Sequence, residues 1–215
     1  AQTVLEKSNL PMLSRLIKYL VDRLLAAIAL TLLSPFLAIL AIAIYLKMGS
    51  PVVFSQLRGG KNNSTFTFYK FRTMTDQRDG DGKLLPDMQR LTPLGEFLRQ
   101  TSLDELPQLW NVLRGDMSLI GPRPFVAAYL ERYTPEQARR HAVAPGITGW
   151  AQINGRNSIS WEEKFKLDLW YIDHCSLWLD LKILIQTVIK VVFKEGIDED
   201  QNTTSTEFMG TVSKQ

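Results

Sequence analysis

The sequence has few of the residues that build disulfides and zinc sites. Its 215 residues include one cysteine, Cys175, and two histidines, His141 and His174. A single cysteine excludes an internal disulfide, and so few cysteines and histidines disfavour a zinc site. These absences fit a protein that faces a reducing compartment.

Basic residues are scarce only at the C-terminal end of the chain. The formal net charge is +3, but residues 195–215 contain five acids and one base, so residues 1–194 carry a net charge of +7. This excess predicts an anionic partner. At this stage the partner could be a phospholipid head group, a nucleotide or a nucleic acid.

One stretch near the N-terminus has no charge at all. Between Arg23 and Lys47 the sequence reads LLAAIALTLLSPFLAILAIAIYL, a run of 23 residues. A straight helix of this length would extend roughly 35 Å, which exceeds a hydrocarbon core of about 30 Å. Length and composition therefore predict a membrane segment.

Ser34 and Pro35 lie at the midpoint of this run. Proline removes one helical hydrogen bond, so a bend is expected there, and the serine hydroxyl can bind a carbonyl that the proline leaves free. Basic residues flank the run on both sides, whereas a spanning helix usually has them on one side. A hairpin that returns to the same face and a kinked helix that crosses once both remain open. A cleaved signal peptide is disfavoured, because the run is too long and starts late.

Two segments after the apolar run are typical of β-strands. SPVVFSQLR and STFTFYKFRTM are rich in β-branched and aromatic residues, and GGKNN separates them. They predict a hairpin with Lys70 and Arg72 near its end. The polar loop that follows contains Asp79 and Asp81 but lacks the glutamate of a calcium loop, so we expect a solvated turn.

Adjacent carboxylates, Asp104 and Glu105, occur in the stretch TSLDELPQLW. Ser102 and Glu105 have the spacing of a capping box, and apolar residues follow at helical spacing. The pattern predicts a helix with both carboxylates in its first turn. The amides and dipole of a helix start would keep a carboxylate ionised and would attract phosphate. A capped helix with no catalytic role has the same pattern.

Three arginines could complete a phosphate site. A short predicted helix over 92–100 carries Arg99, Arg123 lies between two prolines in GPRPF, and Arg156 follows the glycine-rich APGITGWAQING. The prolines fix the backbone around Arg123, which would preset its guanidinium for bidentate phosphate binding. Single arginines are more often surface ion-pair partners. Only convergence on Asp104 and Glu105 would make a site.

Amphipathic patterns occur near both ends of the chain. Residues 10–23 mix apolar and basic residues at helical spacing, and we expect them to lie along a membrane interface. Residues 177–194 repeat apolar residues in the same way, and they could lie on the bilayer surface or pack in the core. Ser160 and Glu163 predict a second capping box before another helix.

Four motifs together resemble the bacterial sugar transferase family, the monotopic phosphoglycosyl transferases. They are Ser34-Pro35 within the apolar run, YKFRTM, LDELPQLWNVLRGDMSLIGPRP and PGITGWAQINGR, in family order. The match covers nearly the whole chain, and it implies a minimal catalytic form without the extra membrane helices and additional domain of larger relatives.

The resemblance implies an α+β fold and favours the hairpin at Ser34 and Pro35. The expected N-terminal part, residues 1–47, is an interfacial and re-entrant membrane helix broken at those residues. A catalytic domain over 48–195 would follow, small, mostly helical and cytoplasmic, with a short β-hairpin and interfacial amphipathic helices. Residues 196–215 are expected to form a flexible tail.

The resemblance also implies a reaction at the cytoplasmic face of the bacterial inner membrane. A UDP-sugar would donate its sugar 1-phosphate to polyprenyl (undecaprenyl) phosphate and release UMP, as the first membrane step of glycan or exopolysaccharide assembly. Asp104 would be the nucleophile, form a phosphosugar-aspartyl intermediate and bind Mg²⁺, with Glu105 assisting. Arg99 and Arg123 would bind phosphate, and Arg156 would contribute to donor binding. Downstream glycosyltransferases could be partners.

Elementary chemistry agrees with this reaction in kind. Aspartyl phosphates are a known form of covalent catalysis, and Mg²⁺ typically takes one or two carboxylates plus substrate phosphates. One alternative is a membrane-anchored adaptor of a glycan assembly complex, with purely structural carboxylates and arginines. Another is a membrane-tethered nucleic-acid binder, which is disfavoured because the arginines are scattered among glycines and prolines rather than gathered on a basic face with stacking aromatics.

Overall fold

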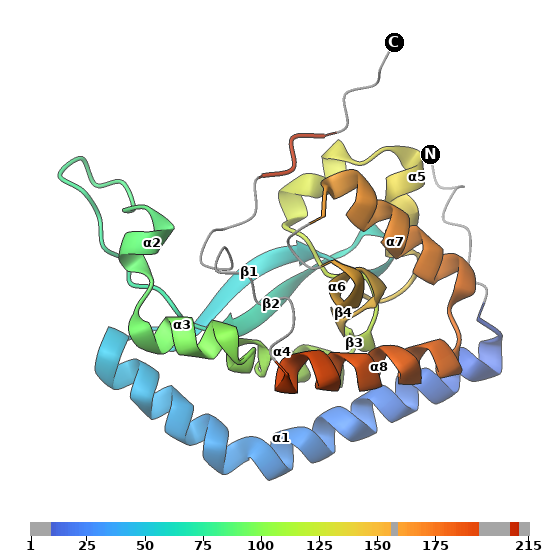
Figure 1. Ribbon diagram of the computed structural model, residues 1–215, viewed down its shortest axis with the longest axis horizontal. Coiled ribbons are helices and arrows are strands. Elements are labelled where there is room, and N and C mark those ends of the chain that lie inside the picture. Colours follow the sequence, from blue (N-terminus) through green and yellow to red (C-terminus); the bar gives the residue numbers. More distant parts are fainter. Residues whose placement is uncertain (1–9, 156–158, 194–206, 211–215) are drawn as a thin grey trace.

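The computed structural model describes residues 10–155, 159–193 and 207–210. Helices predominate over two small sheets, which confirms the predicted mixture of helix and strand (Figure 1). The α-helices are α1 (Met12–Met48), α2 (Asp87–Arg90), α3 (Pro93–Gln100), α4 (Gln108–Arg114), α5 (Pro135–Ala138), α6 (Trp150–Asn154), α7 (Trp161–His174) and α8 (Leu177–Val192). The strands are β1 (Val53–Gly59), β2 (Thr65–Phe71), β3 (Ser118–Ile120) and β4 (Gly146–Thr148). Short 3₁₀ turns are η1 (Lys61–Asn63), η2 (Leu103–Glu105), η3 (Ala127–Arg132) and η4 (Arg139–Ala142).

The apolar run forms one long helix, α1, which bends near its middle (Figure 1). Pro35 lacks the amide that would donate to the carbonyl oxygen of Thr31, and the Ser34 hydroxyl donates to this carbonyl at 2.8 Å. The prediction that the serine satisfies a carbonyl freed by proline is confirmed. The structure has one bent helix here rather than two helices separated by a break, because Ser34 takes over the lost bond.

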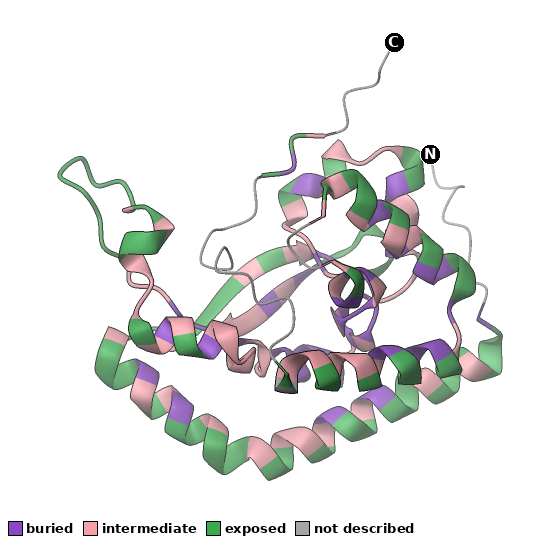
Figure 2. Cartoon of the chain, in the orientation of Figure 1, coloured by how far each residue is buried: buried purple, intermediate pink, exposed green. Residues whose placement is uncertain are grey.

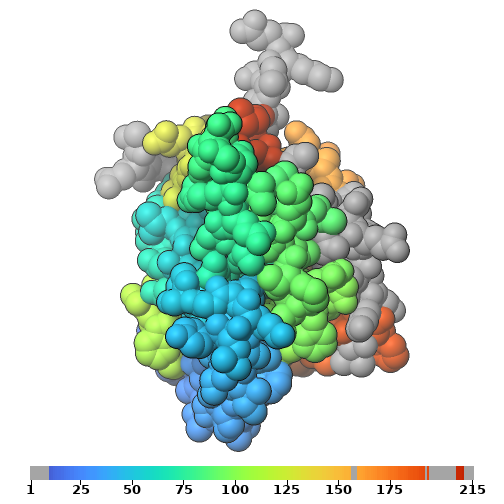
Figure 3. All heavy atoms as spheres, turned by 90° about the vertical axis from the view of Figure 1, so that its left-hand side faces the viewer, coloured from blue at the N-terminus to red at the C-terminus, as the bar shows by residue number. Residues whose placement is uncertain are grey.

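The bend divides α1 into a first arm before Pro35 and a second arm after it, and both arms contact the rest of the chain. Ala26 of the first arm packs with a cluster from β2 and α4, and Leu40 and Ile44 of the second arm pack with Phe71 and Leu98. Much of the remaining surface of α1 is exposed (Figure 2). Seen from the side, α1 forms the lower end of the molecule, with the other elements above it (Figure 3). Within the described part of the chain, α1 is long and apolar enough to cross a membrane.

A polar network fastens the first arm of α1 to the domain. The Lys18 ammonium lies 2.7 Å from a carboxylate oxygen of Asp180 on α8, and the Tyr171 hydroxyl of α7 donates to the other oxygen at 2.6 Å. Ser118 of β3 donates to Asp22 at 2.6 Å. The start of α1 is therefore held directly by α8 and β3, and Tyr171 of α7 supports it through Asp180.

The predicted hairpin is confirmed. β1 and β2 are antiparallel, with Val53 opposite Phe71 and Gly59 opposite Thr65. The second sheet was not predicted; it pairs β3 and β4 in parallel, with Ser118 opposite Gly146. Each of its strands is only three residues long, which is too short for alternation of apolar and polar residues to be recognised in the sequence.

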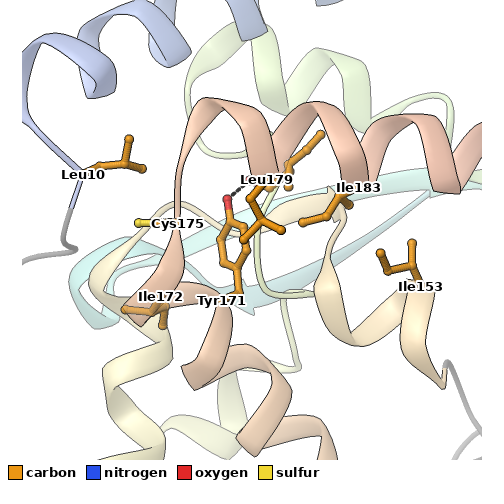
Figure 4. Close-up of a cluster of buried hydrophobic side chains, with 8 residues drawn as sticks. Leu10, Ile153, Tyr171, Ile172, Cys175, Leu179 and Ile183 are labelled. Carbon is orange, nitrogen blue, oxygen red and sulfur yellow. Dashed lines mark hydrogen bonds between the residues drawn. The ribbon is translucent and has the colours of Figure 1, made fainter.

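The main core lies between α7 and α8. Tyr171 points from α7 toward Leu179 and Ile183 of α8 (Figure 4). Leu10, before α1, closes the edge of this cluster. α8 thus packs in the core on one side, while Trp178 on its other side is 76% exposed. The expectation of core packing is confirmed for one face of α8, and the expectation that the segment lies on a bilayer surface stays a prediction for the exposed face.

Part of the predicted tail falls outside the described residues. Residues 207–210 are described, and Phe208 among them is 2% exposed. Its ring lies 5.2 Å from that of Phe165 and 5.3 Å from that of Trp161. Arg132 also pairs with Glu207 at 2.7 Å. This short segment therefore packs on the domain.

Candidate active site

Asp104 and Glu105 lie in the 3₁₀ turn η2, not in the first turn of an α-helix. α4 begins only at Gln108, and Ser102 has a φ of 55°, in the left-handed region, with no capping hydrogen bond from its side chain. The predicted capping box is wrong, because an N-cap residue needs an extended backbone to reach the amide three residues on. The Glu105 carboxylate binds Arg123 instead of the backbone. Side-chain cations, rather than a helix dipole, thus dominate the field here.

Asp104 is a buried residue, with 6% of its surface exposed. Burial, followed by the neighbouring negative charge of Glu105, raises the pKa of its carboxylate to about 6, against the opposing effect of Lys70, Arg99 and Arg123. The carboxylate is therefore ionised at neutral pH but weakly solvated. A poorly hydrated anion surrounded by cations is suited to attack on an electrophile.

Glu105 and Arg123 form an ion pair at 2.6 Å. The Arg123 charge and hydrogen bond outweigh the effect of burial and lower the pKa of Glu105 below its ordinary value. The same interaction raises the pKa of Arg123. The two adjacent carboxylates consequently have pKa values displaced in opposite directions, a pattern that separates their chemical roles.

Arg99 reaches the site from α3. Its Nε donates to the Thr73 hydroxyl at 3.1 Å, just after β2. α3 lies directly against this strand exit, because a Cβ on Gly95 would fall 1.8 Å from the Thr73 carbonyl oxygen. The predicted helix carrying Arg99 is confirmed, with Thr92 as its N-cap. Burial lowers the pKa of Arg99, and Asp104 opposes that effect.

Lys70 of β2 faces the same carboxylates. Burial lowers its pKa, while Asp104 and Glu105 favour its charged form. The position of β2 is fixed by Asn111 of α4, which donates to the Thr67 carbonyl at 2.7 Å and accepts from the Tyr69 amide at 3.2 Å. The Asn111 side chain therefore fixes the strand that carries Lys70.

Arg58 of β1 is a fourth cation. Burial, with the nearby charge of Arg123, lowers its pKa to about 10. Its guanidinium donates to the Pro124 carbonyl at 2.6 Å and lies 4.4 Å from the ring centroid of Phe68. Arg58 therefore contributes positive charge and also holds the loop that carries Arg123.

The structure brings together most of the predicted site. Arg99 and Arg123 converge on Asp104 and Glu105 as expected, whereas Arg156 lies outside the described residues. Sequence reasoning missed Lys70 and Arg58 as members of the site. A signal was present: basic residues on opposite strands of a hairpin whose other residues are largely aromatic or β-branched. Their approach to the carboxylates depends on docking of the hairpin against η2.

The site has an excess of positive charge over its two carboxylates. The cations are Arg58, Lys70, Arg99 and Arg123. Such an excess can accept an anion with several charges, and guanidinium groups suit phosphate oxygens. The arrangement places a buried carboxylate among cations that suit phosphate oxygens, a combination that can support nucleophilic attack on phosphorus.

Comparison with known proteins points to the same chemistry. Residues 13–194 match the family described as "Bacterial sugar transferase". The chain is 56% identical over 197 residues to "Uncharacterized sugar transferase EpsL" of Bacillus subtilis, covering 91% of this chain and 97% of that protein. It is 43% identical over 188 residues to "UDP-glucose:undecaprenyl-phosphate glucose-1-phosphate transferase" of Escherichia coli, covering 82% and 40%.

A third relative is "Undecaprenyl-phosphate glucose phosphotransferase" of Komagataeibacter xylinus. It is 42% identical over 208 residues, which cover 90% of this chain and 39% of that protein. The chain thus spans nearly all of the Bacillus relative but about two fifths of the other two.

Proposed function

The chain belongs to the bacterial sugar transferase family, and from this premise we propose that it transfers a sugar 1-phosphate from a UDP-sugar to undecaprenyl phosphate and releases UMP. Relatives named for this class of reaction support the proposal. The observation that carries it is the buried Asp104 carboxylate, ionised at neutral pH and surrounded by cations that suit a diphosphate.

Asp104 acts as the nucleophile. An oxygen of its carboxylate forms a bond to the β-phosphorus of the UDP-sugar, and the bond from that phosphorus to the bridging oxygen breaks. UMP departs with the bridging oxygen and its electron pair. An oxygen of undecaprenyl phosphate then attacks the same phosphorus, and the bond to Asp104 breaks. The products are undecaprenyl diphosphosugar and the restored carboxylate, as the first membrane step of glycan or exopolysaccharide assembly.

The cations stabilise the negative charge that gathers on the phosphate oxygens. Arg99 and Lys70 flank Asp104 and offset charge on the reacting phosphoryl group, while Arg123 supplies a fork of donors held by Glu105. Glu105 assists by fixing this guanidinium. Arg156 would contribute to donor binding, as the resemblance implies.

The residues present fit a Mg²⁺ ion that the protein and the substrate would bind together. Among the described residues no group of three or more His, Cys, Asp or Glu could hold a metal by itself. Asp104 would hold the ion together with oxygens of the diphosphate, which is the usual mode for Mg²⁺. When bound, the ion offsets charge on the diphosphate.

The reaction would take place at the cytoplasmic face of the bacterial inner membrane. Both arms of α1 contact the same domain, which supports a re-entrant helix whose bend enters the lipid and whose ends remain on one side. Phospholipids would surround α1, and the exposed face of α8 would rest on the interface. The polyprenyl tail would stay in lipid while its phosphate meets the UDP-sugar. Downstream glycosyltransferases would use the product.

The test is UMP release by detergent-solubilised protein with undecaprenyl phosphate, Mg²⁺ and a panel of UDP-sugars. We expect release from a preferred donor and none from Asp104→Asn, whereas Asp173→Asn, an exposed acid on α7, should work normally. Without acceptor, intact-mass analysis should show a sugar phosphate on the wild-type chain that disappears when undecaprenyl phosphate is added. Activity in Asp104→Asn would refute the nucleophile, and absence of UMP from every donor would favour a non-catalytic adaptor.

A further inference from the structure

The backbone of Arg123 is held by a second arginine that the reaction does not use. Arg140, on η4, donates from Nη2 to the Arg123 carbonyl oxygen at 2.7 Å. Its guanidinium carbon lies 4.1 Å from the ring centroid of Phe125, two residues further along the same loop. Arg140 thus contacts the Arg123 loop through one hydrogen bond and one ring face.

Asp168 of α7 fixes Arg140 in turn. Its Oδ2 accepts from Nη2 of Arg140 at 2.7 Å and from Nε at 3.1 Å. The side chains of Arg140 and Asp168 are 1% and 3% exposed. A buried ion pair is therefore connected to the pair in the site: Asp168 of α7 holds Arg140, Arg140 holds the Arg123 backbone, and the Arg123 side chain binds Glu105.

Stability alone gives little reason for this pair. Burial raises the pKa of Asp168 although Arg140 opposes the change, so the cost of desolvation exceeds the attraction. Buried ion pairs can often be replaced by apolar residues of similar volume with little loss of stability. An apolar pair could not replace the hydrogen bond that Arg140 donates to the Arg123 carbonyl oxygen.

We propose that Arg140 and Asp168 are positioning residues for sugar-phosphate transfer, which set the place of the Arg123 guanidinium relative to Asp104. The inference rests on the proposed function. Asp168 binds Arg140, and Arg140 binds the backbone of Arg123. Their effect on the reaction therefore passes through Arg123. A displacement of about 1 Å in such a group can reduce turnover by roughly 100-fold.

The decisive variant is Arg140→Met/Asp168→Leu, which removes both charges together and leaves no buried charge unpaired. The matched control is Arg139→Met/Asp173→Leu, the same replacement in a pair that joins the same two elements but is 24% and 42% exposed. We expect a thermal midpoint near that of wild type for both. Only the first should lose about 10- to 100-fold in kcat, with KM for the UDP-sugar changing less.

Coupling to Arg123 separates positioning from a general structural role. In an Arg123→Ala background, the double replacement at 140 and 168 should cost less than about threefold in kcat, because the group that it positions is gone. If the double variant does not fold, Arg140→Lys carries the test. It keeps the buried positive charge but loses the fork that reaches carboxylate and carbonyl together, and an intermediate loss of kcat is expected.

Two results would overturn the inference. One is a folded Arg140→Met/Asp168→Leu protein, or a folded Arg140→Lys protein, with wild-type kcat. The other is an equal loss in the presence and absence of the Arg123 side chain. Either would leave the proposed function intact, because UMP release by the wild-type chain in the same assay tests that function separately.

Discussion

Replacing Asp104 by Asn should abolish transfer and at the same time stabilise the fold. The carboxylate is ionised in a place where burial and Glu105 raise its pKa from 3.8 to about 6. One pKa unit corresponds to about 1.4 kcal/mol, so ionisation of Asp104 costs the folded state about 3 kcal/mol at neutral pH. Asparagine has nearly the same shape and carries no charge, and its introduction removes this cost.

The sign of the effect depends on pH. A carboxyl whose folded pKa is raised binds its proton more tightly in the folded state, so its contribution to stability is present below pH about 4 and is lost as pH rises through about 6. The stability difference between Asp104→Asn and wild type should therefore be near zero at pH 3.5. It should grow to a plateau above pH 7.

The assay is thermal unfolding in detergent at several pH values, with Asp173→Asn as the control for loss of an exposed acid. For a chain of this size, about 3 kcal/mol corresponds to a rise of roughly 6 to 12 °C in the thermal midpoint. The control should shift by less than about 2 °C. A destabilised Asp104→Asn protein, or a gain that is the same at pH 3.5 and pH 8, would refute the assignment of a desolvated, ionised carboxylate.

Three further outcomes are expected. The rate of UMP release should rise about tenfold per pH unit up to pH about 6 and then level off, because only ionised Asp104 attacks; a rate that falls with pH over this range would contradict it. Arg123→Ala should lower kcat by about 100-fold or more, and Arg123→Lys should not restore it, since the fork that binds Glu105 and phosphate is lost. Chelation of Mg²⁺ should stop transfer yet leave the thermal midpoint of the substrate-free protein unchanged, because the described side chains supply too few ligands; a fall in that midpoint would indicate a metal held by protein alone.

The sequence was most informative where local chemistry decides the structure. The proline in the apolar run predicted the bend of α1, and Ser34 predicted the hydrogen bond that sustains it. The hairpin followed from two β-rich segments around a turn. Each of these features depends on residues that are close together in the chain.

Local reasoning failed where a distant partner changed the outcome. The S-x-x-E pattern predicted a capped helix, but the Glu105 carboxylate found Arg123, 18 residues away, and Ser102 adopted a left-handed backbone. Lys70 and Arg58 reach the site because Asn111 fastens β2 to α4 and because β1 pairs with β2. The spacing of residues in the sequence does not predict how the hairpin packs against α4.

The bend of α1 has a consequence for the lipid environment of the reaction. A helix that crosses a bilayer must match its hydrophobic length to the hydrocarbon thickness, and a mismatch is accommodated by tilt of the helix or by local thinning or thickening of the bilayer. Under the proposed topology α1 enters and leaves one leaflet, and its two arms are fixed to the domain by Lys18 and by Ile44 and its neighbours. The height of Asp104 above the acyl chains is then set by the protein itself. The enzyme should work at similar rates in membranes of different acyl-chain length.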